Sequence, residues 1–433
     1  MGQPKTFDIF IVGNGAVGLA LAHRLLGEAP GVRVAVAGPA DRAGGASLAA
    51  GAMLNAWGEL VRGQMADTAL AERARLAIEA LPLWAPLCAE LSADAPLRAQ
   101  RGAVLRDTAA GALEAETLRE IEAALARAGL PVSRDARGLW IPDGWIDAGG
   151  VIAAYDAAIA ALGATRFDAM ATAVARDGSA WRVETAAGAR FAAGAVVLAN
   201  GPFAQALLDG LPEAAGEIPR LAFEAGGALT ATGAPAMPGV LRTVERGAAG
   251  GFHLVPRAGG EAYLGATSAV SLAAAPPAAG DLARLPAMLA EAGEAALAAL
   301  DWRPSAIGYR AIAADGFPLL GETHLAGLWL AAGFRRDGFT ASPWIARELA
   351  AALLRRPHAL PARFMPARRL ISYKTRAAAI ADAAEGRGEA GRERLERLYD
   401  RRGLESFGVH PALIGLYESD VDYARIRHPC ALA

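Results

Sequence analysis

The sequence predicts an α/β protein that opens with a β-α-β unit, and three observations lead to this prediction. The 433 residues are 54% hydrophobic and 20% charged, which is typical of a folded globular chain and not of a disordered one. An apolar run at residues 7–12 meets a glycine-rich turn and then a helical stretch at 19–26. A second apolar run at 32–37 follows, so strand, helix and strand succeed one another in a short span.

The composition also excludes several classes of function. Lys and Arg together number 43 and Asp and Glu 45, so the net charge of −2 gives no basic surface for nucleic acid or an anionic membrane. The mean hydropathy is +0.25, yet no unbroken apolar stretch reaches the length of about 18 residues that a membrane span requires. Two cysteines, Cys88 and Cys430, are too few for a disulfide framework, and the histidines lack metal-ligand spacing. We therefore expect a cytoplasmic protein without a metal site.

The turn after the first strand fits the G-x-G-x-x-G pattern of a Rossmann-like dinucleotide-binding loop. Gly13 permits the tight turn, Gly15 lets a pyrophosphate approach the backbone, and Gly18 lets the helix pack closely on the strand. The helix that follows offers free N–H groups to the phosphates. The residues expected to contact a dinucleotide here are Gly13, Gly15, Ala16, Val17 and Gly18.

One part of this pattern is missing, and its absence favours a flavin over a nicotinamide cofactor. The second strand usually ends in an acid that accepts from the ribose 2′-OH, but here it ends at Gly38, so Asp41 or the backbone takes that role. Flavin sites use many other contacts and tolerate this loss better. The small-residue segment 44–54 also allows backbone N–H groups to crowd a diphosphate, and Ser47 adds a hydroxyl.

Further elements follow along the chain. Strands are predicted at 181–185, 195–199 and 327–332, and the last leads through a loop with two adjacent arginines into a helix at 341–354. An alanine-rich helix is expected at 287–300.

Taken in order, these motifs resemble the FAD-dependent D-amino acid oxidase superfamily, in particular its glycine oxidase and sarcosine oxidase branch, over residues 7–356. The matching motifs are Gly13–Gly18, Ala46-Ser47 with Gly51-Ala52-Met53, Asp143–Asp147, Val197–Gly201, Leu254–Arg257, Gly265–Thr267, Gly308–Arg310 and Gly333–Gly338. The resemblance implies FAD, bound non-covalently because residues 46–53 contain neither His nor Cys. Besides the glycine loop, the resemblance implies further residues that contact the cofactor. They are Ala46, Ser47, Gly51, Ala52, Met53, Val174, Gly201, Gly333, Arg335, Arg336, Asp337, Gly338, Phe339 and Thr340.

The resemblance also implies a fold of two domains built from discontinuous segments. The Rossmann-like FAD-binding domain takes residues 1–82, 146–212 and 306–356. An α+β substrate domain with a mainly antiparallel sheet takes 83–145 and 213–305, and residues 357–433 form a C-terminal helical extension.

The activity implied is oxidation of an amine or amino acid, in which hydride leaves the C–H next to nitrogen for flavin N5 and the imine then hydrolyses. Arg310 matches the arginine that binds the substrate carboxylate through two parallel bonds, and its alternative role is an ion pair between domains. Arg336 aligns with a second arginine near flavin and substrate. Arg335 beside it leaves the assignment open by one position, and on an extended loop only one of the two faces the flavin.

His253 is the third candidate catalytic residue. It binds the substrate or accepts the amine proton if it points into the site, and otherwise it is a structural histidine in a strand. Tyr309 and Tyr263 are weaker candidates. Two other functions fit the same motifs, namely oxidation of a 2-hydroxy acid and a flavoprotein subunit that passes electrons to a partner.

The C-terminal extension, residues 357–433, lies beyond the resemblance. Leu395 and Leu398 have helical spacing, and Glu393 and Arg397 form an i,i+4 pair. The extension is interpreted as a helical appendage on the FAD domain, a lid, an arm for a homo-oligomer, or a docking element for a partner enzyme.

Overall fold

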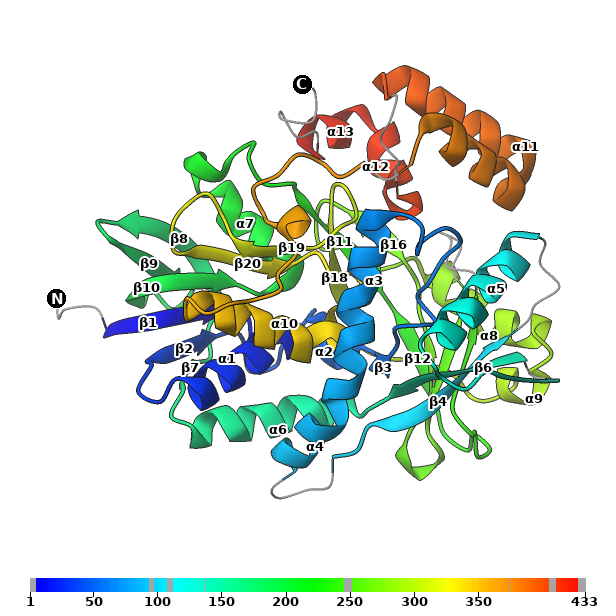
Figure 1. The fold of residues 1–433 in the computed structure, drawn as a ribbon, viewed down its shortest axis with the longest axis horizontal. Coiled ribbons are helices and arrows are strands. Elements are labelled where there is room, and N and C mark those ends of the chain that lie inside the picture. The colour runs from blue at the N-terminus through cyan, green and yellow to red at the C-terminus, as the bar shows by residue number, and fades with distance from the viewer. Residues whose placement is uncertain are drawn as a thin grey trace.

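The structure is a computed structural model that describes residues 5–92, 97–106, 112–136, 138–244, 251–372, 374–404 and 410–426. These ranges form three sheets with helices around them (Figure 1). Within them, no helix combines the length and apolar character that crossing a lipid bilayer requires. The predicted α/β fold with a mainly antiparallel second sheet and C-terminal helices is confirmed.

The first sheet contains the predicted β-α-β unit. Its order is β19-β20-β10-β1-β2-β7, with the β8–β9 hairpin attached to β10. Strands β1, β2, β7, β10 and β20 run parallel. The five predicted strands are confirmed as β1, β2, β9, β10 and β20 with ends shifted by a few residues. The bounds are β1 Lys5–Val12, β2 Val34–Ala37, β7 Thr165–Phe167, β8 Ala171–Asp177, β9 Ala180–Thr185, β10 Arg190–Leu198, β19 Leu319–Glu322 and β20 Leu328–Ala332.

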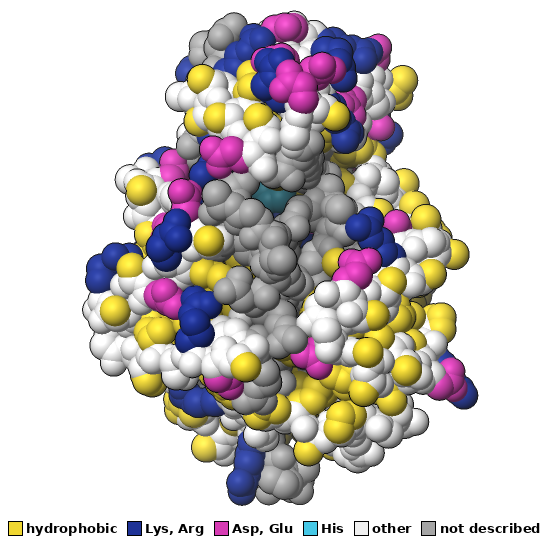
Figure 2. All heavy atoms as spheres, turned by 90° about the vertical axis from the view of Figure 1, so that its right-hand side faces the viewer, with side chains coloured by type: hydrophobic (Ala, Val, Ile, Leu, Met, Phe, Trp, Pro, Cys, Tyr) yellow, Lys and Arg dark blue, Asp and Glu magenta, His cyan; other side chains and the backbone are white. Residues whose placement is uncertain are grey.

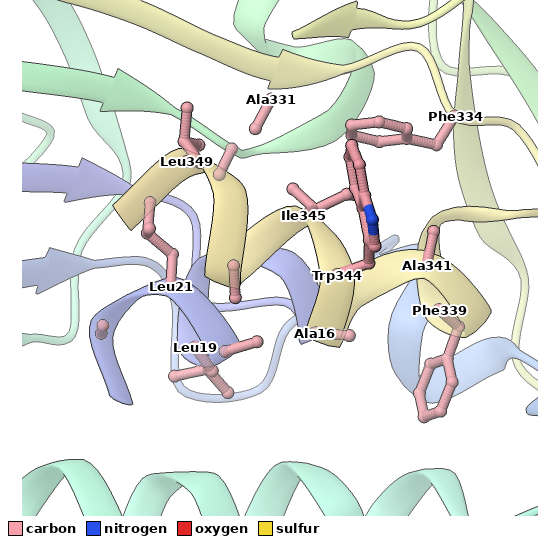
Figure 3. Packing of buried hydrophobic residues seen from close by; sticks show 14 of the residues in the cluster. Ala16, Leu19, Leu21, Ala331, Phe334, Phe339, Ala341, Trp344, Ile345 and Leu349 are labelled. Atoms are coloured by element: carbon pink, nitrogen blue, oxygen red, sulfur yellow. The ribbon is translucent and has the colours of Figure 1, made fainter. Parts of the chain in front are cut away.

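Helices α1 (Ala16–Glu28), α6 (Ala148–Ala161) and α10 (Gly338–Leu353) cover one face of this sheet (Figure 1). Leu19, Leu21, Trp344 and Ile345 are fully buried between α1, α10 and the strands, as Figure 3 shows. Burial of each such side chain stabilises the fold by about 1.5–3 kcal/mol. This core holds the N-terminus of α1, and with it the glycine loop, in place. The short α7 (Ala204–Asp209) follows β10.

The second sheet has the order β17-β12-β15-β14-β13-β4-β6-β3, with β5 paired to β6. Its neighbours are antiparallel except β4 and β13, which run parallel. The bounds are β3 Met53–Leu54, β4 Gln100–Arg106, β5 Ser133–Asp135, β6 Gly138–Trp145, β12 Ala228–Ala231, β13 Val240–Thr243, β14 His253–Pro256, β15 Ala262–Gly265 and β17 Arg303–Pro304. The division of the chain at residues 82, 145, 212, 305 and 356 stays a prediction.

Further helices are α2 Ala46–Ala49, α3 Thr68–Ala80, α4 Trp84–Leu91, α5 Ala112–Arg127, α8 Ala279–Glu291 and α9 Ala295–Ala298. The single alanine-rich helix expected at 287–300 is wrong. The segment is split into α8 and α9, because Gly293 adopts a left-handed φ of 83° that an α-helix cannot contain.

A third, antiparallel sheet of order β16-β11-β18 lies under the C-terminal helices. Its strands are β11 Leu221–Gly226, β16 Ala269–Ser271 and β18 Gly308–Ala313. The helices above it are α11 Arg376–Arg402, bent at Gly388, then α12 Ile414–Glu418 and α13 Asp420–Ile426 (Figure 1). The expected Glu393–Arg397 pair is confirmed at 3.3 Å. The extension thus packs on this third sheet, whose strands come from both predicted domains.

Candidate functional site

A cavity of about 530 Å³ opens at the carboxyl ends of β1, β2, β10 and β20. This edge is where parallel α/β sheets bind ligands, because the crossover loops diverge there. The cavity brings together most of the predicted cofactor residues: Gly13, Gly15, Ala16, Val17, Ala46, Ser47, Gly51, Ala52, Met53, Gly201, Gly333, Arg335, Arg336, Gly338 and Phe339. Arg310, His253, Tyr309 and Tyr263 line it as well.

Four predicted cofactor residues do not line the cavity but brace its walls. The backbone of Gly18 lies behind the loop, against the Gly13 carbonyl. Val174 is 2% exposed and packs with Trp181 in a hydrophobic core, while Met170, Ala171 and Thr172 of the same segment reach the wall.

The other two lie at the start of α10. Asp337 binds Arg73, with Nη2 and Oδ2 2.9 Å apart. The Thr340 hydroxyl accepts from the Asn55 N–H at 3.1 Å and donates to the Met53 carbonyl at 3.0 Å. These two side chains therefore tie the arginine loop to the segment 53–55 and to α3.

The glycine loop leaves a space that fits a dinucleotide. Gly13 has a φ of 122°, and a Cβ added there would lie 2.5 Å from the Ala199 carbonyl carbon. A Cβ on Gly15 would lie 2.9 Å from Oγ of Ser47, which accepts from the Ala16 N–H at the start of α1. Among the described residues, the buried Oδ1 of Asn200 has no hydrogen-bond partner. A tight backbone cradle with an unsatisfied polar atom suits a bound polar cofactor.

The structure also explains the glycine at the usual acidic position. A Cβ on Gly38 would lie 2.4 Å from Oδ1 of Asn14, whose Nδ2 donates to the Pro39 carbonyl at 2.9 Å. Asp41, the acid considered as a substitute, does not line the cavity, because its carboxylate accepts from the Ala43 N–H at 3.1 Å. Arg42, which the sequence reasoning missed, does line it.

Three arginines and one buried glutamate meet at the other end of the cavity. Arg335 binds Glu224 through two bonds, Nη2 to Oε1 at 2.7 Å and Nε to Oε2 at 3.1 Å. Oε1 also accepts from the Ser268 hydroxyl at 2.6 Å and lies 3.8 Å from Nη1 of Arg310. Burial alone would raise the pKa of Glu224, but Arg335 and Arg310 outweigh it and hold this pKa well below its usual value.

Arg310 and Arg336 are the arginines left for a ligand. Nη2 of Arg310 donates to the Thr267 carbonyl at 2.7 Å, which fixes its guanidinium. Arg336 lines the cavity, and no hydrogen bond of its side chain occurs among the described residues. Burial and the charge of Arg310 lower the pKa of Arg336 to about 9. Three guanidinium groups facing one carboxylate leave an excess of positive charge that an anionic ligand would relieve.

An aromatic wall closes the cavity near the second sheet. The rings of His253 and Tyr263 stack with centroids 5.9 Å apart, and the Tyr263 hydroxyl donates to the Ala49 carbonyl at 2.9 Å. Asn55, also at the wall, accepts from Arg242. No sequence motif indicated either Asn55 or Glu224.

We expect Glu224→Gln to destabilise the fold by about 3–5 kcal/mol at pH 7, because Arg335 and Arg310 lose their buried counter-ion. The folded-state pKa of Glu224 is lowered from 4.5, so the carboxylate stabilises the fold above that value. This stabilisation declines as the pH falls below it. Urea unfolding of wild type and variant should therefore differ most near neutral pH and converge in acid. The exposed Glu291→Gln on α8 is the control, and an equal effect of both variants would contradict the assignment.

Comparison with known proteins agrees with this geometry. Residues 8–352 match the family described as FAD dependent oxidoreductase. The fold is similar to glycine oxidase from Geobacillus kaustophilus, at 26% identity and a TM-score of 0.72, covering 85% of this chain and 100% of that one. It is also similar to L-proline dehydrogenase from P. horikoshii (20%, TM-score 0.66, 84% and 98% covered). A third similar fold is L-amino acid deaminase from Proteus vulgaris (17%, TM-score 0.67, 85% and 98% covered). The chain therefore belongs to the family of FAD-dependent oxidoreductases, and FAD is its cofactor.

Proposed function

We propose that the chain oxidises a small amine or amino acid that carries a carboxylate. Hydride leaves the C–H next to nitrogen, and the resulting imine hydrolyses to a carbonyl compound and an amine. When bound, FAD supplies the hydride acceptor at N5. The observation that carries the proposal is the pair Arg310 and Arg336 at one end of the cavity, where positive charge exceeds negative charge. The names of the similar structures, an oxidase, a dehydrogenase and a deaminase, also support it.

In this proposal the substrate carboxylate binds Arg310 and Arg336. The bond to the Thr267 carbonyl holds the Arg310 guanidinium in one orientation, so little freedom is lost when the substrate binds. Gly226 makes room for it, since an added Cβ would lie 2.0 Å from Nη2 of Arg310. A carboxylate fixed in two places sets the direction of the adjacent carbon and its C–H bond.

The same charges favour the reactive form of the substrate. A hydride leaves most readily from carbon next to a neutral nitrogen, whose lone pair forms the imine. Nearby positive charge lowers the pKa of an ammonium group, so Arg310 and Arg336 favour its deprotonation. We propose His253, at the cavity wall, as the group that accepts this proton.

The opposite end of the cavity is proposed to hold the cofactor. Gly13, Gly15 and the first turn of α1 would contact the pyrophosphate through backbone N–H groups, with the Ser47 hydroxyl beside them. The unsatisfied Asn200 oxygen would accept from a cofactor hydroxyl or N–H. We further propose a cytoplasmic protein, consistent with Cys88, which is buried and unpaired within the described chain.

An anaerobic bleaching screen tests the proposed function. The flavin absorbance of the purified protein is followed after addition of glycine, sarcosine, D-amino acids and 2-hydroxy acids without oxygen. We expect bleaching by at least one amino acid, and weaker or no bleaching by its carboxylate-free amine. Bleaching by 2-hydroxy acids alone would replace the proposal with alcohol oxidation. Absence of bleaching by all of them would favour a subunit that only passes electrons to a partner.

A further inference from the structure

The C-terminal extension contacts Arg335 behind the arginine end of the cavity, although the family match ends at residue 352. Nε2 of His410, between α11 and α12, lies 2.6 Å from Nη1 of Arg335. We propose that helices α11–α13 form the back wall of the carboxylate-binding site and that His410 is a positioning residue. It holds Arg335 on Glu224 and thereby keeps Arg310 free for the substrate. This inference rests on the proposed function.

The third sheet explains why the extension affects this site. Glu224 on β11 pairs in register with Arg310 on β18, and Ala222 pairs with Ile312 two residues along. Residues two apart in a strand share one face, so all four side chains lie on the same face of the sheet. Glu224 and Arg310 lie at the cavity end of that face. Ala222 and Ile312 are buried by Leu398, Tyr399 and Leu413 of the extension.

The extension is firmly attached on its inner side. The fully buried Asp315, just after β18, binds Arg368 through both carboxylate oxygens at 2.9–3.0 Å. The Tyr417 hydroxyl donates to the Ala314 carbonyl at 2.9 Å. The outer surface carries intermixed basic and acidic side chains, as the top of Figure 2 shows. Arg394 and Glu418 form a partly exposed ion pair on α11 and α12. One face is therefore a packed wall and the other is solvated.

The chemistry of His410 suits a neutral acceptor. An arginine only donates hydrogen bonds, so Nε2 must accept from Arg335. Burial and the charge of Arg335 hold the pKa of His410 well below its usual value, which keeps the ring neutral. The Ala412 N–H is the competing donor, since it points at Nδ1 at 3.1 Å. A neutral imidazole accepts at one nitrogen only, and the charged Arg335 is the stronger donor. We therefore assign the acceptor role to Nε2 and the ring proton to Nδ1.

Glu224 is a potential competitor for the substrate. Its Oε1 already forms an ion pair with Nη1 of Arg310 at 3.8 Å, and a small shift would turn this contact into a direct hydrogen bond. The two bonds from Arg335 hold the carboxylate away from that position. Arg335 itself has a left-handed φ of 52°, a costly conformation for a residue with a side chain, and so depends on its partners to stay in place. Removal of the His410 acceptor would loosen Arg335 and let Glu224 move onto Arg310.

Acetate binding to the FAD-loaded enzyme tests the inference, measured by calorimetry and by the change in flavin absorbance. We expect His410→Leu to weaken acetate binding about tenfold, which corresponds to the loss of roughly one hydrogen bond to a charged group. His410→Gln should stay near wild type, because its amide oxygen replaces Nε2 as acceptor. His358→Leu, at an exposed histidine of the same extension, is the matched control and should change nothing. Unchanged acetate binding in His410→Leu would overturn the inference.

A second variant keeps the test valid if His410→Leu does not fold. Arg335→Lys keeps the charge but loses the two parallel bonds to Glu224, so acetate binding should weaken to a similar extent. Wild-type affinity in Arg335→Lys would likewise overturn the inference. The two proposals fail differently. If Arg310→Gln and Arg336→Gln leave acetate binding unchanged, the proposed function fails. If these two variants weaken acetate binding but the His410 and Arg335 variants do not, only this inference fails.

Discussion

Arg310→Gln is expected to lower kcat/KM for the best carboxylate-bearing substrate by about 10²–10³-fold, the effect of removing one partner of a charge-assisted pair worth roughly 2–5 kcal/mol. The loss should fall mainly on KM if the arginine only binds the carboxylate, and also on kcat if it directs the C–H toward the flavin. The measurement is steady-state kinetics on enzyme matched for FAD content. The side chain ends at the cavity wall and is only 12% exposed, so water replaces the guanidinium poorly.

Two comparisons make the Arg310 result specific. Arg303→Gln changes an arginine on β17 that is 77% exposed and paired only on the surface with Asp301, and it should leave the kinetics unchanged. A carboxylate-free amine should react equally slowly with wild type and Arg310→Gln, because neither makes the carboxylate contact. If Arg310→Gln kept wild-type kcat/KM, the assignment of the carboxylate site to this end of the cavity would be wrong.

The parts of this protein that the sequence predicts well are those in which local chemistry decides the structure. The glycine turn, its flanking strands and the first helix lie within one short segment, so each residue's role follows from its neighbours. The small-residue segment around Ser47 is similar, since small side chains are needed wherever backbone approaches a ligand. These predictions needed no knowledge of distant contacts.

A motif does not tell which side chains face a ligand, and Asp337 and Thr340 in the loop and first turn of α10 illustrate this. In the loop and first turn of α10, Arg336, Gly338 and Phe339 line the cavity. Asp337 and Thr340 point back to Arg73 and to the 53–55 segment instead. The Val174 side chain likewise packs in the core, because the alternation of β8 directs it there, so its predicted cofactor contact, through backbone atoms, stays a prediction.

The charge cluster was beyond sequence reasoning because its members are far apart in the chain. Arg335 is separated from Glu224 by 111 positions and from His410 by 75. A partial signal did exist, since Glu224 is an acid within the otherwise apolar strand 221–226, and a buried acid requires a buried cation.

Gly18→Val is expected to weaken FAD binding by about 10²-fold or more, equivalent to ~2.7 kcal/mol. A Cβ at Gly18 would lie 2.0 Å from the Gly13 carbonyl oxygen, which is impossible without moving the loop away from α1. Because Gly13 and Gly15 form the cradle on the same turn, that movement displaces the backbone N–H groups proposed to bind the pyrophosphate. The measurement is the FAD to protein ratio after gel filtration, followed by titration of the apoprotein with FAD.

Gly27→Ala is the matched control on the same helix, since nothing lies within 4 Å of a Cβ added there. It should keep full FAD content and gain up to about 1 kcal/mol of stability, because alanine favours a helix over glycine. Circular dichroism separates the two explanations for a loss of FAD binding in Gly18→Val. A folded protein without FAD supports the cradle, whereas an unfolded one shows that Gly18 matters for the packing of α1 on β1 as a whole. A folded Gly18→Val protein with wild-type FAD affinity would mean that the cofactor does not depend on this turn, and the site would have to be sought elsewhere along the cavity.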